Sequence, residues 1–495
     1  MTLTVTNTLT GEREPFEPRD PDSVLLYFCG LTVSDDAHLG HARAWVHVDV
    51  MHRWLEHQGY EVRHVENFTD VNEKIVARVG RDDFGASEGE VASHFIASVI
   101  EDMRGLNLLR ADVYPRVSEH VPEIVSLVET LLERGYAYES NGSVYFDVTT
   151  FEDYGKLSNQ RIGEMEAQGS DDEVAEKRHP QDFALWKDDG VSASDVVEHR
   201  DGDVSTEEDL PTGDTWESPW GEGRPGWHIE CSAMSMTHLD ESIDVHVGGQ
   251  DLVFPHHENE IAQSEAATGE QFAKYWLHVR LLETGGEKMS TSLQNYFTVS
   301  NALEEFGVNS IRMFLVSTAY NRPQTYSEAT LSEAVERWET LDRAYERAAT
   351  ACDSPDAYAT VTDQAFHETI ESSREEFVEA MNDDFNTRRA VTALIELAGE
   401  LNAHLDDRER YDYSALRETI ELFEDLGSGV LGFVFGEETP SGEVDLAEEL
   451  VELILDVREA ERERGNYDRA DELRSELEAL GIEVQDTDEG PKARF

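Results

Sequence analysis

The chain has 495 residues and carries 106 Asp and Glu against 40 Lys and Arg, which gives a formal net charge of −66. The hydrophobic share is only 39%, and high charge with low hydrophobicity is also typical of disordered chains. Aromatic residues nevertheless make up 9% and are spread along the sequence, so we expect a folded protein of about three domains. Only seven basic residues are Lys. An acidic surface poor in Lys predicts a halophilic protein, because in 1 M salt surface charges are screened within about 3 Å.

The composition excludes several classes of protein. No run of 18 apolar residues occurs, so we expect no transmembrane helix and no membrane partner. The first 20 residues lack the basic and apolar regions of a secretory signal. Three cysteines, Cys29, Cys231 and Cys352, do not make a disulfide framework. We therefore expect a cytoplasmic protein whose cysteines are metal ligands, nucleophiles or small buried side chains.

The N-terminal third alternates between strand and helix patterns. Residues 24–28 form a continuous apolar run, typical of a strand buried on both faces, and 61–66 alternate like a second strand. A helical pattern covers 39–57 between them, and further helical patterns lie near 86–105 and 119–134. This order predicts a doubly wound, parallel α/β sheet.

The rest of the chain has a different texture. Residues 136–147 resemble a hairpin around Asn141-Gly142, and the acidic stretch 164–217, rich in Gly and Ser, predicts an insertion with an exposed loop. Strand and helix patterns resume over 227–297. The later elements that we expect are an all-helical region at about 300–430 with helices at 331–349 and 365–381, a linker or turn at 427–442, two amphipathic helices over 444–480 and a short strand at 482–485.

The segment His38-Leu39-Gly40-His41 follows the first strand at the opening of a helix. A helix N-terminus offers oriented N–H groups and partial positive charge, and Gly permits a close approach, so this place suits a polyphosphate. The two histidines can donate to phosphate oxygens as charge develops in a transition state. Two surface histidines at a helix start are the alternative interpretation.

A second motif, Lys288-Met-Ser-Thr-Ser292, follows Thr284-Gly-Gly-Glu287. A Gly-rich segment with one of only seven lysines and three hydroxyl groups predicts a mobile clamp for phosphate. A solvated loop is the alternative. The two motifs together indicate more than either one alone, because they bracket an α/β region in this order.

A third group of residues is typical of metal ligands. Cys29 and Cys231 supply two thiols, and His256 and Glu260 are four residues apart, on one face of a helix that we expect to begin near Pro255. Two thiolates, an imidazole and a carboxylate can bind Zn²⁺. The ligands are far apart in the sequence, so spacing alone does not establish a site.

Other interpretations of this group stay open. Either cysteine can be a small buried side chain, and His256 can be a capping or core residue. His257 is the alternative ligand, although its side chain points roughly 100° away on the helix.

The two phosphate-binding motifs resemble the His-Ile-Gly-His and Lys-Met-Ser-Lys-Ser signatures of class I aminoacyl-tRNA synthetases, with Leu39 in place of Ile and Thr291 in place of the second Lys. This resemblance implies a Rossmann-type catalytic domain with a connective insertion, ATP with Mg²⁺, and aminoacyl-adenylate chemistry. His38, His41 and Lys288 would stabilise charge on the phosphates. The missing lysine puts the role of residue 291 in doubt.

Further stretches resemble one family of that class, the cysteinyl-tRNA synthetases, from about residue 23 to the end of the chain. They are Cys29-Gly30, Asn67-Phe-Thr-Asp-Val71, Pro225 to Met234, Gly248 to Ser264 and Asp383-Asp-Phe-Asn-Thr387.

The resemblance implies roles for individual residues. The ligands of one Zn²⁺ would be Cys29, Cys231, His256 and Glu260, and the metal would select the thiolate of the substrate over the hydroxyl of serine. Trp227 would wall the small pocket, and Thr69 would meet the amino group of the substrate. The implied ATP-binding residues are Gly40, Gly248, Gly249, Asp251, Lys288 and Thr291.

The resemblance also implies a division into domains. The expected parts are a Rossmann-type catalytic domain at 1–300 with a connective insertion at about 115–225, a stem-contact helical segment at 301–345, a helical bundle domain at 346–435, and a small C-terminal α(+β) anticodon-binding domain at 443–495. The helical region and the tail would hold tRNA.

The charge of −66 conflicts with tRNA binding, because it repels a polyanion. Basic residues cluster locally, however, at Arg388-Arg389 and at five positions of the tail: Arg458, Arg462, Arg464, Arg469 and Arg474. We expect the tail to contact tRNA. Salt bridges with neighbouring Glu are the alternative for any single Arg.

These features predict a monomeric enzyme that ligates L-cysteine to tRNA(Cys) with ATP, through cysteinyl-adenylate. Two alternatives remain. A cysteine ligase of low-molecular-weight thiol biosynthesis shares the zinc ligands but lacks the full C-terminal portion. A non-catalytic, tRNA-binding relative would bind ATP without turnover, and only Thr291 supports it.

Overall fold

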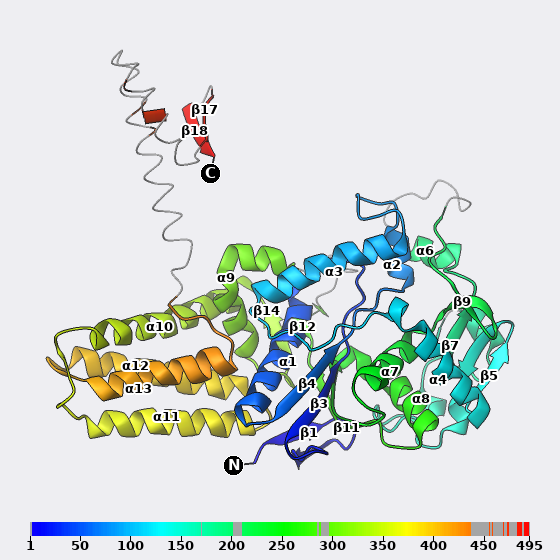
Figure 1. Ribbon diagram of the computed structural model, residues 1–495, viewed down its shortest axis with the longest axis horizontal. Coiled ribbons are helices and arrows are strands. Elements are labelled where there is room, and N and C mark those ends of the chain that lie inside the picture. The colour runs from blue at the N-terminus through cyan, green and yellow to red at the C-terminus, as the bar shows by residue number, and fades with distance from the viewer. Residues whose placement is uncertain are drawn as a thin grey trace. The chain divides into compact units, whose positions relative to one another are not determined.

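The computed structural model describes residues 2–169, 171–200, 210–284, 287–288 and 297–436, together with short parts of the C-terminal tail. The chain divides into two compact units, Met1–Phe435 and Gly436–Phe495. Within the first unit, a parallel sheet stands between an antiparallel sheet on one side and a group of long helices on the other (Figure 1).

The parallel sheet has four strands: β3 (Ser23–Phe28), β4 (Glu61–Glu66), β10 (Ile243–Gly249) and β11 (Ala273–Val279), in the order β11-β10-β3-β4. Helix α1 (Leu39–His57) connects β3 to β4 and packs against β4, β10 and β11. The chain winds outward from β3 in both directions, so the topological switch point lies between β3 and β10. The predicted Rossmann-type sheet is confirmed.

The connecting segment between β4 and β10 forms the antiparallel sheet. Its strands, in spatial order, are β5 (Ala137–Ser140), β6 (Ser143–Phe146), β7 (Phe183–Asp188), β9 (Gly221–Pro225) and β8 (Trp216–Ser218). The predicted hairpin is confirmed, and Asn141 and Gly142 at its tip both have positive φ, as a tight hairpin turn requires. The helices in this part of the chain are α2 (Glu73–Arg78), α3 (Glu88–Gly105), α4 (Val121–Arg134), α5 (Asp171–Glu176), α6 (Ala193–His199), α7 (Trp227–His238) and α8 (Glu258–Thr268).

Strand β7 corrects the expectation of an exposed loop over 164–217. It lies in the middle of the antiparallel sheet, and Phe183, Leu185 and Trp186 are buried there. This short apolar run is flanked by acidic segments, so the average composition of the stretch concealed it. Residues 201–209 of the same stretch lie outside the described residues.

The region after residue 300 is helical, as predicted, and the expected helices at 331–349 and 365–381 are confirmed. Its helices are α9 (Val299–Val316), α10 (Glu328–Cys352), α11 (Gln364–Asn382), α12 (Thr387–Asp406) and α13 (Tyr413–Leu422). Short strands accompany them: β12 (Leu282–Thr284), β13 (Glu287–Lys288) and β14 (Gln324–Tyr326) make one small sheet, β15 (Ala357–Tyr358) pairs with β16 (Tyr411–Asp412), and near the N-terminus β1 (Thr4–Asn7) pairs with β2 (Glu12–Pro15).

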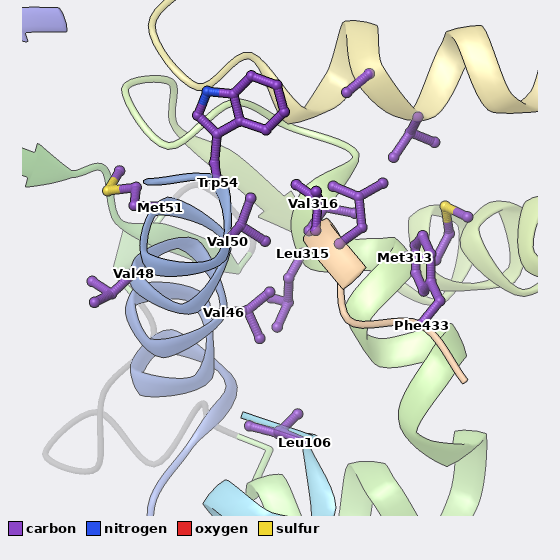
Figure 2. Packing of buried hydrophobic residues seen from close by; sticks show 14 of the residues in the cluster. Val46, Val48, Val50, Met51, Trp54, Leu106, Met313, Leu315, Val316 and Phe433 are labelled. Carbon is purple, nitrogen blue, oxygen red and sulfur yellow. The ribbon is translucent and has the colours of Figure 1, made fainter. Parts of the chain in front are cut away.

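One hydrophobic core joins the sheet region to these helices. Figure 2 shows Val46 and Val50 of α1 directed toward Leu315 and Val316 of α9, with Phe433 nearby. Phe433 belongs to the predicted linker at 427–442, yet it is buried in this core. Residues 431–436 form neither helix nor strand, and the boundary between the two units falls between Phe435 and Gly436, which agrees with the predicted linker or turn. The burial of Phe433 within it was not predicted.

The second unit is described only in part. Strand β17 (Glu483–Thr487) pairs with β18 (Gly490–Arg494), which confirms the strand predicted at 482–485. The two helices predicted over 444–480 lie largely outside the described residues. Among the helices that the structure does describe, none has the length and apolar character needed to cross a membrane.

Candidate metal centre and nucleotide site

The carboxyl ends of β3 and β10 bring distant segments of the chain together. Cys29 directly follows β3, and its backbone N–H donates to the carbonyl of Val247 in β10, at 3.0 Å. Cys231 comes from α7, and His256 and Glu260 lie just before and within the first turn of α8. Open parallel sheets bind ligands at this edge, beside the switch point. The predicted metal ligands meet there.

The four predicted ligands form a compact, buried cluster. Cys29 Sγ lies 3.6 Å from Cys231 Sγ and 3.4 Å from His256 Nε2, and His256 Nε2 lies 3.1 Å from Glu260 Oε1. Their donor atoms all lie within 4.8 Å of one another, and none of the four residues is more than 6% exposed. This group can hold a metal ion.

The helix carrying His256 and Glu260 differs from the expectation. α8 begins at Glu258 rather than near Pro255, because Phe254 has extended φ and ψ and the turn at Val253–His257 is wider than an α-helical turn. His256 and Glu260 still face the same side. The alternative ligand His257 turns toward His278, with 2.8 Å between His257 Nδ1 and His278 Nε2.

The protonation equilibria of the cluster suit a cation. The hydrogen bond with Cys29 and burial together raise the pKa of the Cys231 thiol well above its usual value. Burial lowers the pKa of His256, but the neighbouring Cys231 and Glu260 outweigh this effect and raise it to about 10. Burial raises the pKa of Glu260, and the neighbouring His246 and His256 bring it down to about 2. Metal binding releases protons from thiols and imidazoles, so a cation satisfies all these groups at once.

Two histidines that the sequence analysis did not single out support the cluster. His246 Nε2 lies 2.9 Å from Glu260 Oε2, and His228 Nδ1 lies 3.0 Å from His256 Nδ1. Such partners fix the orientation of metal ligands. His228 is three residues before Cys231, and His246 is two residues before Gly248 in β10. Only His228 lies within a stretch that resembles the family, so the sequence offered a signal for His228 and none for His246.

The predicted substrate residue Thr69 is connected to the cluster through Asn67. Asn67 Oδ1 accepts from the hydroxyl of Tyr27 at 2.9 Å and from the N–H of Gly30 at 3.0 Å, and it lies 3.8 Å from Cys231 Sγ. Asn67 Nδ2 donates to Thr69 Oγ1 at 3.2 Å. A side chain at Gly30 would place Cβ 1.7 Å from the Asn67 carbonyl, so this approach requires glycine.

The other predicted substrate residue, Trp227, lies beside the cluster. Its ring centroid is 4.5 Å from that of His256, and the residue is 41% exposed. Trp227 therefore contacts the buried cluster and is also exposed to solvent, and its role as a wall of a small pocket stays a prediction.

The first phosphate motif forms the start of α1 as predicted. His38 is the N-cap: its Nδ1 accepts from the N–H of Gly40 at 3.0 Å, and His41 Nδ1 accepts from the N–H of His38 at 3.3 Å. The two rings stack with centroids 3.9 Å apart. Both histidines are thus fixed at the helix N-terminus.

The predicted ATP residues Gly248 and Gly249 end β10 at the same edge of the sheet as Cys29. A Cβ at Gly248 would lie 2.4 Å from the ring of His257, and one at Gly249 would lie 2.6 Å from Asp251 Oδ1. Gly248 has no room for a side chain beside the buried ring of His257, and a side chain at Gly249 would require the carboxylate of Asp251 to move. The backbone is open to a close approach only while both residues are glycine.

Of the second phosphate motif, the structure describes only the backbone of Lys288. The backbone of Lys288 pairs with Glu283 of β12, while the side chain of Lys288 and all of Thr291 lie outside the described residues. The chain then returns to α1, because Leu39 donates to the carbonyl of Phe297 at 3.0 Å and Val299 donates to Ala37.

The basic residues give a mixed result. Arg389 lies 3.3 Å from Asp383 and 3.6 Å from Glu379, which favours the salt-bridge interpretation at that position. Arg388 is exposed, and Arg458 is buried. Arg469 is exposed and Arg474 half-buried, whereas Arg462 and Arg464 lie outside the described residues.

Comparison with known proteins shows the family of the chain. Residues 15–336 match the family of tRNA synthetases class I (C) catalytic domains, and residues 376–436 match the DALR domain. Full-length relatives named cysteine--tRNA ligase come from Haloarcula marismortui, at 66% identity over 100% of both chains, and from Halobacterium salinarum, at 63% over 100% of both. A further relative of that name, from Thermococcus onnurineus, is 42% identical over 99% of this chain and 98% of its own.

The chain belongs to the cysteine–tRNA ligase family. The expected halophilic character agrees with the sources of its relatives at 66% and 63% identity. Among solved structures, methionyl-tRNA synthetase of Mycobacterium tuberculosis in complex with methionyl-adenylate has a TM-score of 0.60 at 15% identity, covering 83% of this chain and 92% of that one. This likeness confirms the class I fold.

Proposed function

We propose that this member of the cysteine–tRNA ligase family attaches L-cysteine to tRNA(Cys) in two steps. The cysteine carboxylate attacks the α-phosphorus of ATP, so that cysteinyl-adenylate forms and pyrophosphate leaves. The 2′-OH of the terminal ribose of the tRNA then attacks the carbonyl carbon, and AMP leaves. The observation that supports cysteine as substrate is the buried cluster of Cys29, Cys231, His256 and Glu260 at the switch point of the sheet.

The donor set of this cluster fits Zn²⁺. Two thiols, one imidazole and one carboxylate are ligands that zinc prefers, and the pKa of the Cys231 thiol is raised as long as no cation compensates its burial. Within the described residues, the buried Glu260 Oε1 has no hydrogen-bond donor, and it lies 3.1 Å from His256 Nε2 and 3.9 Å from His257 Nε2. Zn²⁺ bound here would take the substrate thiolate as an additional ligand and so distinguish cysteine from serine, whose hydroxyl stays protonated.

The surrounding side chains define the size and orientation of the substrate. Trp227 shields the cluster from solvent and limits the room for larger side chains. Asn67 fixes the hydroxyl of Thr69, which then accepts from the amino group of cysteine. Size alone discriminates between small side chains by about 1–3 kcal/mol, so the metal has to supply most of the selectivity.

The adenylate step uses the start of α1 and the end of β10. His38 and His41 donate to the phosphates as negative charge develops, and Lys288 holds the leaving pyrophosphate with its Mg²⁺. The backbone at Gly248 and Gly249 receives the adenosine, with Asp251 beside it. Thr291 contacts the phosphates more weakly than a lysine, so Lys288 carries most of that charge.

We propose the following organisation around this site. The catalytic domain spans 1–300 with an insertion at about 115–225, the stem-contact segment 301–345, the helical bundle 346–435 and the anticodon-binding domain 443–495. The helical parts and the tail hold tRNA, and the enzyme acts as a monomer in the cytoplasm. The match of the DALR domain to residues 376–436 supports the helical assignment.

The experiment that tests this function is charging of tRNA with labelled cysteine in multi-molar KCl, with ATP and Mg²⁺ and with serine as the control. We expect charging with cysteine only. Charging of a small amine in place of tRNA would favour the thiol-biosynthesis ligase. No charging by folded, zinc-loaded protein would favour the non-catalytic relative, and either result would overturn the proposal.

A further inference from the structure

Arg43 lies on α1, two residues after His41, and it is completely buried. All five of its N–H groups are used. The acceptors are the carbonyl of Arg280 (2.9 Å from Nε), the carbonyl of Leu315 (3.4 Å) and Oε1 of Gln324 for Nη1, and the carbonyls of Ala319 (3.0 Å) and Arg322 (2.7 Å) for Nη2.

None of these five acceptors carries a charge. Burial therefore lowers the pKa of Arg43 to about 9 without compensation by a carboxylate. A second fully buried arginine, Arg312, has the usual arrangement, because its Nη2 donates to Asp49 Oδ2 at 2.6 Å. A buried cation without a counter-ion adds little net stability. The contribution of Arg43 is therefore the fixed geometry of the hydrogen bonds that its planar guanidinium donates.

The acceptors of Arg43 lie around the small sheet of β12, β13 and β14, which carries the backbone of Lys288 and is called the stem below. Arg280 lies two residues before β12, and Gln324 is the first residue of β14 and pairs with Leu282, the first residue of β12. β12 in turn pairs with the backbone of Lys288. Arg43 therefore binds both neighbouring strands of the stem where they begin.

The same helix also binds the chain where it returns from the second motif. Leu39 donates to the carbonyl of Phe297 at 3.0 Å, and Val299 donates to that of Ala37 at 2.9 Å. The N-terminal half of α1 thus contacts the backbone on both sides of the second motif. A rotation or shift of α1 would change the place of His38 and His41 relative to that stem.

We propose that Arg43 is a positioning residue that keeps the backbone at Lys288 in register with His38 and His41. This inference rests on the proposed function, in which those three residues act on the same phosphates. An enzyme that works by placing groups loses up to about 100-fold in rate when a group moves by 1 Å. The guanidinium of Arg43 connects the two motifs through neutral acceptors only, so it acts by fixing their relative positions and forms no ion pair.

The test compares Arg43→Lys with Arg312→Lys as the matched control, since both replace a fully buried guanidinium. Pyrophosphate exchange with cysteine measures the adenylate step at a temperature well below both melting temperatures. We expect Arg43→Lys to lower kcat about 10- to 100-fold, with zinc content and KM for cysteine unchanged. Arg312→Lys should lower the melting temperature by a similar amount and keep kcat within about twofold, because it lies away from the stem.

A second variant with a smaller structural change keeps the test valid if Arg43→Lys does not fold. Gln324→Met removes one acceptor of Arg43 and leaves the other four. We expect a smaller loss of kcat in the same direction, again without loss of zinc. If folded Arg43→Lys and Gln324→Met both exchange pyrophosphate like the wild type, or if Arg312→Lys loses as much activity as Arg43→Lys, the positioning role is wrong.

A second readout separates this inference from the proposed function. Amide hydrogen exchange can be followed at Leu282–Thr284 and at Phe297–Val299 in the wild type and in both lysine variants. We expect at least about tenfold faster exchange at these segments in Arg43→Lys only, because their local opening becomes easier. If the wild type exchanges no pyrophosphate with cysteine, the proposed function fails, and unchanged protection in Arg43→Lys would overturn the positioning role independently.

Discussion

The metal cluster and the start of α1 are two sites at one edge of the sheet, and they are built in opposite ways. The cluster takes its four side chains from the end of β3, from α7, from the turn before α8 and from α8 itself, and it depends on the whole fold to bring them together. The start of α1 consists of four consecutive residues whose side chains cap their own helix. The residues of the first site are far apart in the sequence, and their side chains suit one kind of ligand. The residues of the second site are consecutive, and a helix N-terminus suits many anions.

In the proposed function, this difference separates the choice of substrate from the chemical step. A buried group of thiols selects a thiol, and a capped helix N-terminus accepts any polyphosphate. Mutations in the cluster should therefore remove metal and cysteine binding together. Mutations in α1 should slow the adenylate step and leave the metal in place.

The largest effect is expected for Cys231→Ser. A serine hydroxyl stays protonated, so we expect almost complete loss of zinc and a fall in cysteine activation of more than about 100-fold. Zinc is measured by metal analysis and activation by pyrophosphate exchange. Cys352→Ser on α10 is the matched control and should keep full zinc; full zinc in Cys231→Ser would disprove the ligand assignment.

The next effect tests the start of α1. In His41→Asn the amide oxygen can still accept from the N–H of His38, while the outer ring nitrogen is lost. We expect kcat for pyrophosphate exchange to fall about 10²- to 10³-fold, as for removal of one transition-state donor. Zinc content should stay normal. Loss of zinc in this variant would break the separation between the two sites.

A pH-dependent change in stability is expected from Glu66, whose side chain contacts α1. Glu66 ends β4 and accepts from Trp45 Nε1 at 2.7 Å, and burial raises the pKa of its carboxyl to about 8. Because the folded-state pKa lies above the unfolded one, the contribution of Glu66 to the free energy of unfolding is greatest below about pH 4.5 and is lost as the pH rises to about 8, by a few kcal/mol. Glu66→Gln should remove this slope, as measured by denaturant unfolding at fixed salt. An identical slope in the variant would contradict the assignment.

The smallest effect is expected for Thr291→Lys. The added charge restores the usual residue of the second motif, so exchange activity should stay the same or rise by less than about tenfold. Steady-state kinetics in ATP measure this change. A large loss would show that Thr291 has a specific role of its own.

The sequence predicted the regular elements well where the pattern was strong and local. The strand at Ser23–Phe28, the helix at Leu39–His57 and the strand at Glu61–Glu66 follow from apolar runs and periodicity alone. β7 was missed because its apolar run is short and surrounded by acidic residues. The packing of Phe433 was missed because burial there depends on α9 and α10, which no local pattern shows.

The candidate site divides in the same way. His38 and His41 are neighbours in the sequence, so their placement at a helix start could be predicted from the residues themselves. The grouping of Cys29 with Cys231, His256 and Glu260 came from the family resemblance, since three-dimensional contact between distant segments leaves no spacing to recognise. His228, His246 and Asn67 act through other residues, and only the structure shows that they touch the cluster.

The reciprocal hydrogen bonds at the start of α1 also decide a tautomer. Nδ1 of His38 accepts from Gly40, and Nδ1 of His41 accepts from His38, so in both rings this nitrogen carries a lone pair. Each neutral imidazole therefore keeps its proton on Nε2. In this tautomer the two stacked rings can each donate from Nε2 without carrying a charge. In the proposed function, these two histidines would bind phosphate without a change in the charge of the enzyme.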